Sequence, residues 1–173
     1  MNIIVHTPHS CLLSLFSSLL GELCDYRSRT YGRIIHKFIE NSIYIQSRTL
    51  RAICDNNRIQ CRNTPSRKRL REYMKNGNFI VFEIHTFPPD TINWKLDKNP
   101  SIVLLTVGND NRLLYRVYEI LKPYFSIDIV QGSDVNDIQM EVQEYGGSGV
   151  LIELNQTLSL DQAKQIGQLL NRM

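Results

Sequence analysis

Residues that can bind a metal ion or move a proton lie at the ends of apolar runs in the sequence. His9 follows the run over residues 2–5, Glu83 and His85 lie in Phe-Glu-Ile-His, and Glu153 interrupts an otherwise wholly apolar stretch. Glu83 and His85 are two residues apart, so on a strand their side chains point to the same face. Two imidazoles with carboxylates at neighbouring strand ends are side chains that can together bind a metal ion.

Each of these residues also has a purely structural interpretation. An ionised carboxylate among apolar residues needs compensation, which Glu153 could find in a buried ion pair with Arg51 or Arg58. A single histidine at a strand end is more often a satisfied polar group than a ligand, whereas two histidines with carboxylates at neighbouring strand ends raise the odds of a metal site without making it the favoured interpretation. His6, on the first predicted strand, could be a further ligand, and His36, in Ile-Ile-His-Lys-Phe, is expected to be structural.

A second group of polar residues lies in the segment Arg-Ala-Ile-Cys-Asp-Asn-Asn-Arg. This segment contains Arg51, Asp55, Asn57 and Arg58. A planar guanidinium binds a carboxylate through two parallel hydrogen bonds, so these residues suit recognition of a substrate carboxylate. The alternative is a solvated turn, which the spacing by itself favours.

The apolar runs before these residues predict buried strands that alternate with helices. Strands are expected over 2–5, 42–47, 51–54, 79–84, 101–107, 126–130 and 150–154, and helices over 12–23, 31–40, 65–75, 112–121 and 160–170. Residues 132–149 are expected to be irregular. This pattern predicts a single three-layer α/β domain over residues 1–173, with a mixed, mainly parallel central sheet. Such sheets place their sites outside the carboxyl ends of the strands.

Two of the expected helices have recognisable start signals. Thr64 precedes Pro65, where threonine accepts hydrogen bonds from the first amides and proline suits the first helical position. Ser159 is followed three residues later by Gln162, which is the spacing of a capping box. These signals predict helices that begin at residues 65 and 160.

Composition excludes several classes of protein. A chain of 173 residues with 42% hydrophobic and 21% charged residues fits one globular domain rather than a disordered tail. The stretch over 11–24 is interrupted by polar residues, is too short to span a membrane and lacks the basic region of a signal peptide. The four cysteines include no Cys-x-x-Cys pair, so we expect reduced thiols, a cytoplasmic location and no membrane association.

Positive charge is concentrated in one segment. The net charge is only +3, although residues 58–71 contain six basic residues and no acidic one. Nucleic-acid binding would use Arg62, Arg67, Lys68, Arg69 and Arg71. On a helix Arg67 and Arg71 share a face while Lys68 and Arg69 diverge, and few aromatic residues lie among them. A solvated helix is therefore favoured over a nucleic-acid site.

Taken together, these segments resemble the N-formylglutamate amidohydrolase family, a branch of the carboxypeptidase-like zinc hydrolases related to aspartoacylase and succinylglutamate desuccinylase. The family motif P-H-S-G is similar to residues 8–10, and R-x-x-x-D-x-N-R matches residues 51–58. The motif D-x-H-S-F-P is similar to residues 83–88, and Q-x-E-I-N-R-x-L-Y resembles residues 151–158. The four motifs occur in the family's order and extend over most of the chain.

The resemblance implies one zinc ion held by His9, His85 and an acidic residue. Asp25 is the expected third ligand and Glu22 the reserve, because an apolar residue stands where a His-x-x-Glu pattern would place a glutamate. Glu153 would be the general base and acid, which activates the attacking water and then protonates the leaving amine.

The resemblance also implies roles for the remaining polar residues. Arg58 and Asn57 would hold the substrate carboxylate, Arg51 would polarise the scissile carbonyl, and Glu83 would orient His85. The implied function is zinc-dependent hydrolysis of an amide bond in a small N-acylated amino acid, as in N-formylglutamate, or at a peptide terminus that bears a carboxylate. The alternative is a non-catalytic relative that keeps the fold and binds a ligand or partner.

Overall fold

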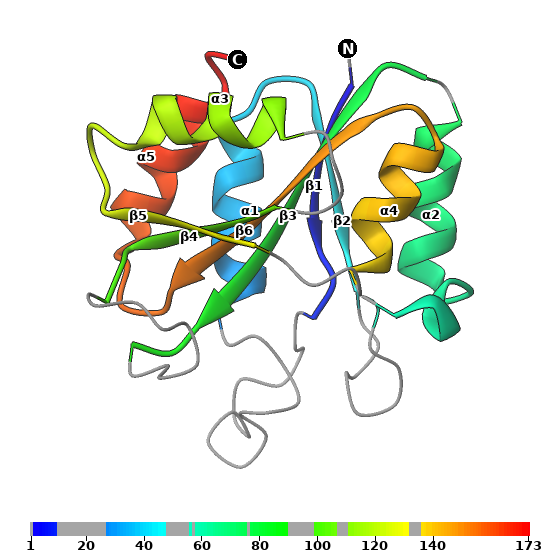
Figure 1. Ribbon diagram of the computed structural model, residues 1–173, viewed down its shortest axis with the longest axis horizontal. Coiled ribbons are helices and arrows are strands. Elements are labelled where there is room, and N and C mark those ends of the chain that lie inside the picture. Colours follow the sequence, from blue (N-terminus) through cyan, green and yellow to red (C-terminus); the bar gives the residue numbers. More distant parts are fainter. Residues whose placement is uncertain are drawn as a thin grey trace.

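The computed structural model describes residues 2–9, 27–47, 56, 58–75, 77–89, 99–106, 111–131 and 136–173. Within them a sheet of six strands has the order β2-β1-β3-β6-β4-β5 (Figure 1). The strands are β1 (Asn2–Thr7), β2 (Ser42–Gln46), β3 (Phe79–Phe87), β4 (Ile102–Thr106), β5 (Ile127–Gln131) and β6 (Ser148–Asn155). Neighbouring strands pair in parallel except β4 and β6, which are antiparallel. The predicted mixed, mainly parallel sheet is confirmed.

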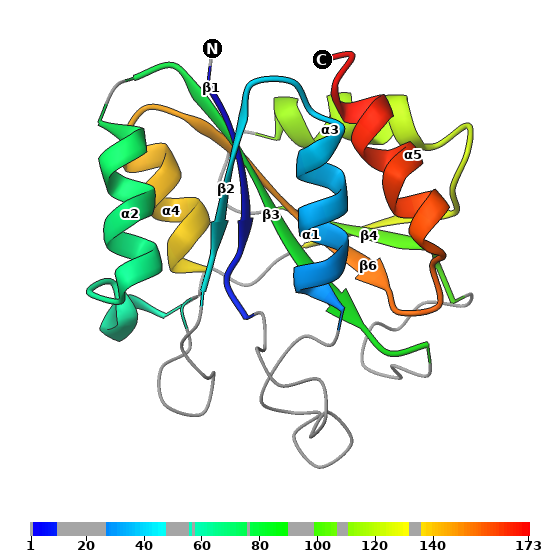
Figure 2. The ribbon, with the colours of Figure 1, turned by 180° about the vertical axis from the view of Figure 1, so that it is seen from behind.

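Helices cover both faces of the sheet. α1 (Ser28–Lys37), α3 (Arg112–Leu121) and α5 (Leu160–Leu170) lie on one side, and α2 (Pro65–Met74) and α4 (Asp137–Glu144) lie next to each other on the other (Figures 1 and 2). A short 3-10 helix, η2 (Ile59–Cys61), precedes α2. The result is the three-layer α/β arrangement predicted from the sequence.

Side chains that point alternately to the two faces of the sheet divide the hydrophobic core into two parts. Val5 and Phe82 pack in the cluster covered by α1, α3 and α5, whereas Ile4 and Val81 pack in the cluster covered by α2 and α4. All four side chains are fully buried. Successive strand residues point to opposite faces, so strands buried on both sides need the continuous apolar runs seen in this sequence.

The helix starts agree with the sequence signals, with one difference in detail. The capping box at the start of α5 is confirmed, because Ser159 Oγ accepts from Gln162 N at 3.1 Å and Gln162 Oε1 accepts from Ser159 N at 2.8 Å. α2 begins at Pro65 as predicted, but the Thr64 side chain makes no capping hydrogen bond. It donates instead to Asn56 Oδ1 at 2.5 Å, because the asparagine offers a buried acceptor.

The expectation of an irregular segment over 132–149 is wrong. α4 occupies the middle of this range, and Asn136 caps it by accepting hydrogen bonds from Ile138 N and Gln139 N. The sequence pattern did not predict this helix because its inward face combines two buried apolar residues, Ile138 and Val142, with buried polar side chains. Apolar periodicity does not detect a helix whose buried face is partly polar.

Some expectations fall on other parts of the chain. The predicted helix over 12–23 and the predicted strand over 51–54 lie outside the described residues, and the single domain over 1–173 stays a prediction. No helix in the part of the chain that the structure describes is long and apolar enough to cross a membrane.

Cys61 is buried and disulfide-bonded, which differs from the expected reduced thiols; the other cysteines lie outside the described residues. The cytoplasmic location stays a prediction.

Candidate functional site

Two histidines from neighbouring strands meet at the carboxyl edge of the sheet. His9 follows β1 and His85 lies near the end of β3, and these two strands pair in parallel. The ring centroids are 4.9 Å apart and the ring planes make an angle of 82°. Both residues are almost fully buried, at 2% and 4% exposure. The structure thus brings together the two imidazoles that the sequence singled out.

A buried carboxylate holds one nitrogen of His85. Glu83 is fully buried, and its Oε1 is 2.8 Å from His85 Nε2. Burial acts to raise the pKa of Glu83, but the interaction with His85 and a hydrogen bond from Gln139 outweigh it, and the pKa is lowered. The carboxylate is therefore ionised and accepts from Nε2, which fixes the orientation of the His85 ring.

Two amides from α4 complete the surroundings of Glu83. Gln139 Nε2 donates to Glu83 Oε2 at 2.6 Å, and Asn136 Nδ2 lies 3.4 Å from both carboxylate oxygens. Space for Gln139 depends on Gly149 of β6, where an added Cβ would lie 2.0 Å from Gln139 Oε1. Sequence reasoning missed both amides because it did not expect α4. The helix-cap signal of Asn136 followed by Asp137 was the available clue.

His6 lies on the same face of the sheet as Glu83. The two residues are opposite each other in the β1/β3 register, and His6 is fully buried. Neither ring nitrogen of His6 has a hydrogen-bond partner within the described part of the chain. Burial lowers the pKa of His6 to about 3 despite the opposing charge of Glu83, so the ring is neutral.

His6 does not complete a metal-binding group with the other histidines. Among the described residues there is no cluster of three His, Cys, Asp or Glu side chains placed to hold a metal ion. The described part of the chain therefore supplies a pair of imidazoles, His9 and His85, rather than a full ligand set. Asp25 and Glu22, the expected third ligand and its reserve, lie outside the described residues.

Glu153 is placed beside the histidine pair by the sheet. It lies opposite His85 in the parallel β3/β6 register, so both side chains point to the face covered by α2 and α4. Glu153 is only partly buried, in contrast to the fully buried Glu83. The two carboxylates near His85 thus occupy different environments, one enclosed and one within reach of solvent.

The expected substrate-binding group is described only in part. Arg51 and Asn57 lie outside the described residues. Arg58 immediately precedes η2 and is exposed. Asn56, which the motif R-x-x-x-D-x-N-R leaves unspecified, is fully buried and donates to Pro8 O, next to His9. The remaining histidine, His36, has the structural role expected, because its Nδ1 lies 2.8 Å from Ser42 Oγ and its ring stacks on Tyr44.

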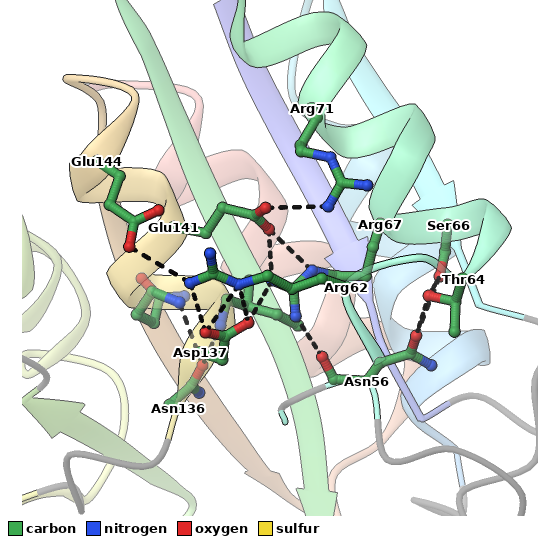
Figure 3. A network of polar contacts seen from close by, with 12 residues as sticks. Asn56, Arg62, Thr64, Ser66, Arg67, Arg71, Asn136, Asp137, Glu141 and Glu144 are labelled. Carbon is green, nitrogen blue, oxygen red and sulfur yellow. Dashed lines mark hydrogen bonds and ion pairs between the residues drawn. The ribbon is translucent and has the colours of Figure 1, made fainter. Parts of the chain in front are cut away.

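Arginines of the basic segment pair with acidic residues of α4 (Figure 3). Arg62 contacts Asp137, Arg67 contacts Asp137 and Glu141, and Arg71 contacts Glu141. These contacts turn the shared face of Arg67 and Arg71 toward α4 rather than toward solvent. The basic residues of α2 that stay exposed are Lys68 and Arg69. The surface on which the nucleic-acid alternative depends is correspondingly smaller.

Comparisons with known proteins identify the fold. No family model matches the sequence, and no curated protein matches it significantly. A gene product of Agrobacterium tumefaciens superposes with a TM-score of 0.75 at 14% identity, covering 98% of this chain and 87% of that one. N-formylglutamate amidohydrolase from Ralstonia eutropha gives 0.73 at 13% identity, covering 98% and 91%. N-acetylmuramoyl-L-alanine amidase from Clostridium difficile gives 0.52 at 13%, covering 99% and 94%.

These comparisons show that the chain has an α/β fold with a mixed, mostly parallel sheet, and that amidohydrolases also have this fold. More particularly, the chain has the fold of N-formylglutamate amidohydrolase over nearly its whole length. The resemblance inferred from four short motifs is therefore confirmed at the level of the fold. The identities are low, so the activity has to be argued from the residues of this chain.

Proposed function

We propose that the protein is a zinc-dependent amidohydrolase that cleaves the amide bond of a small N-acylated amino acid, as in N-formylglutamate, or of a peptide terminus bearing a carboxylate. The observation that carries this proposal is the 4.9 Å separation of the His9 and His85 rings. Zinc–nitrogen bonds of about 2.0–2.1 Å at tetrahedral angles put the centroids of two imidazole ligands roughly 5 Å apart. The histidine pair fits this requirement.

The donor chemistry at the pair also suits zinc. Glu83 fixes the tautomer and orientation of His85, which is the usual arrangement for a histidine that ligates zinc. We propose Asp25, with Glu22 as the reserve, as the acidic third ligand. The chemistry that zinc supplies when bound is a lower pKa for water and polarisation of the scissile carbonyl.

The proton transfers are assigned to Glu153. Its carboxylate takes a proton from the attacking water as the oxygen bonds to the carbonyl carbon, and it gives that proton to the amide nitrogen as the carbon–nitrogen bond breaks. A partly exposed carboxylate beside His85 suits this role better than Glu83, whose oxygens are held by His85 and α4. We assign the substrate carboxylate to Arg58 and Asn57, and polarisation of the carbonyl to Arg51.

Zinc content and substrate hydrolysis test this proposal together. Elemental analysis after exhaustive dialysis should find one equivalent of zinc per chain. N-formylglutamate and related N-acylated amino acids should be hydrolysed, a chelator should stop the reaction, and added zinc should restore it. A substrate esterified at its carboxylate is the matched control and should react more slowly. A folded protein that neither retains zinc nor releases amine would contradict the proposal and favour the non-catalytic relative.

A further inference from the structure

A charged side chain is enclosed between α2 and α4. Arg67 is the largest of the fully buried side chains in the described part of the chain, with 0% exposure. Its Nε and Nη2 donate to Glu141 Oε2, and Nη2 also donates to Asp137 Oδ2 at 2.8 Å (Figure 3). Its Nη1 donates to the backbone oxygen of Asn56 at 2.5 Å. The guanidinium therefore joins α4 to the segment that contains Asn56.

Asn56 continues this connection to the segment after β1 that carries His9. Its Nδ2 donates to Pro8 O at 2.9 Å and to Ser47 Oγ at 2.7 Å, while its Oδ1 accepts from Thr64 Oγ1 at 2.5 Å. Pro8 directly precedes His9, so the Asn56 side chain holds the backbone from which that imidazole projects.

The other end of the connection leads to His85. Asp137, which binds Arg67, directly follows Asn136, the residue that caps α4 and faces Glu83. Gln139, two residues after Asp137 in the same first turn of α4, supplies the amide that donates to Glu83, and Glu83 holds His85 Nε2. Contacts that fix α4 therefore also fix the carboxylate that orients the second imidazole.

Stability alone does not require an arginine at this position. A buried ion pair can usually be replaced by apolar side chains of similar volume with no loss of stability, because removing the charges from water is costly. A guanidinium offers something that an apolar side chain lacks, namely several donors in a rigid fork that bind different segments at fixed angles. At Arg67 the fork binds α4 on one side and the Asn56 backbone on the other.

We propose that Arg67 and Asn56 are positioning residues of the candidate site and form a buried bridge between the segment that carries His9 and α4, the helix whose amide holds Glu83 beside His85. The bridge sets the separation of the two imidazoles by fixing the His9 backbone and α4 relative to each other. Its consequence for metal binding rests on the proposed function, whereas the bridge itself is a property of the zinc-free fold.

The experiment compares Asn56→Asp and Arg67→Lys with Arg71→Met. Asn56→Asp keeps the shape of the side chain but replaces the group that donates to Pro8 O. Arg67→Lys keeps the charge and removes the fork. Arg71 binds the same Glu141 from the same helix, so Arg71→Met is the matched control. If Arg67→Lys does not fold, Asn56→Asp tests the same bridge from its other end.

Two measurements apply to each variant. Zinc affinity by competition with a chromogenic chelator should fall roughly 10- to 100-fold in Asn56→Asp and Arg67→Lys, the range for residues that support metal ligands, and should be unchanged in Arg71→Met. Amide hydrogen exchange of the zinc-free protein over residues 2–9 should be faster in Asn56→Asp and unchanged in Arg71→Met.

The outcomes separate the bridge from the proposed function. If wild-type protein binds zinc and the three variants show equal affinities and equal exchange, the bridge is refuted and the hydrolase proposal stands. If wild-type protein binds no zinc, the hydrolase proposal fails, and hydrogen exchange alone then tests the bridge. Faster exchange over residues 2–9 in Asn56→Asp than in Arg71→Met then supports the bridge, and equal exchange in these two variants refutes it.

Discussion

The two faces of the sheet are stabilised in different ways. Under α1, α3 and α5 the core is a continuous cluster of aliphatic and aromatic side chains. Under α2 and α4 a smaller apolar cluster gives way, toward the carboxyl ends of β1 and β3, to buried histidines, carboxylates and an arginine. The first face obtains its stability from apolar burial, and the second gives up part of that burial to hold polar groups in fixed positions.

This comparison indicates where chemistry is possible in the molecule. Buried polar groups are costly unless they are paired, so a fold carries many of them on one face only when they pair with each other or serve a site. On the α2/α4 face Arg67 pairs with the carboxylates of Asp137 and Glu141, whereas His6 is buried with neither ring nitrogen bonded within the described residues. Substitutions on the two faces should therefore have different effects.

The largest effect is expected at the imidazole pair. His85→Ala should lose stoichiometric zinc and with it all turnover, because one of the two proposed nitrogen ligands is removed. Elemental analysis of the dialysed variant measures this loss. His36→Ala is the control, since His36 stacks on Tyr44 away from the site and should leave zinc content intact. Full zinc occupancy in His85→Ala would refute the assigned ligand.

The second-largest effect is expected on the catalytic rate rather than on zinc binding. Glu153→Gln should keep zinc bound and lower kcat by roughly 10²- to 10⁴-fold, because it removes the proton carrier and leaves the ligands in place. Steady-state kinetics and zinc analysis on the same preparation check both halves of the prediction. A variant with near-wild-type kcat would show that Glu153 is not the base.

A substitution on the apolar face should separate stability from metal binding. Phe82 is adjacent to Glu83 in β3 but points to the opposite face, where it is fully buried. Phe82→Ala should lower the free energy of unfolding by about 3–5 kcal/mol through the cavity that it leaves, while the folded protein keeps its zinc affinity. Chemical denaturation and zinc titration measure the two quantities. Loss of zinc affinity without loss of stability would contradict the division between the faces.

A smaller effect is expected where β6 meets α4. Gly149→Ala should displace Gln139 from Glu83 and weaken zinc binding by about tenfold, at the lower end of the range for groups that support ligands. Gly146→Ala is a matched control, because its φ of 75° makes the substitution strained while nothing lies within 4 Å of the added Cβ. It should lower stability without changing zinc affinity. Equal zinc affinities in the two variants would argue against the Gln139 contact.

The smallest effect concerns the pH dependence of stability. Burial acts to raise the pKa of Asp137, but hydrogen bonds from Arg62 and Arg67 and their charges outweigh it, so its pKa lies below the ordinary value of 3.8. A lowered pKa in the folded state adds stability above pH 3.8 that is lost as pH falls through the native value. Asp137→Asn should therefore be less stable than wild type at pH 7, and the difference should shrink below pH 3.8. Urea denaturation at several pH values measures this, and a constant difference would contradict it.

The same division between the faces explains which elements could be predicted. The bounds expected for two helices agree with α3 and α5, whose apolar residues recur at helical spacing against an apolar core. α4 was missed because its buried face includes Gln139 and Glu141, and a pattern of hydrophobicity does not distinguish polar residues that face water from those that face a buried arginine.

The sequence alone indicated the approximate positions of the strands, the placement of Glu83 and His85 on one face and the candidates His9 and Glu153, because period-two geometry and chain direction are local properties. The ends of β1 and β3 lie two to three residues beyond the predicted ones. The convergence of these side chains required the strand order β2-β1-β3-β6, which places β1 and β6 on either side of β3. The tertiary structure alone decided that Arg67 is buried and that Asn56 reaches Pro8. Such contacts join residues distant along the chain, and local spacing carries no information about which distant group satisfies a buried charge.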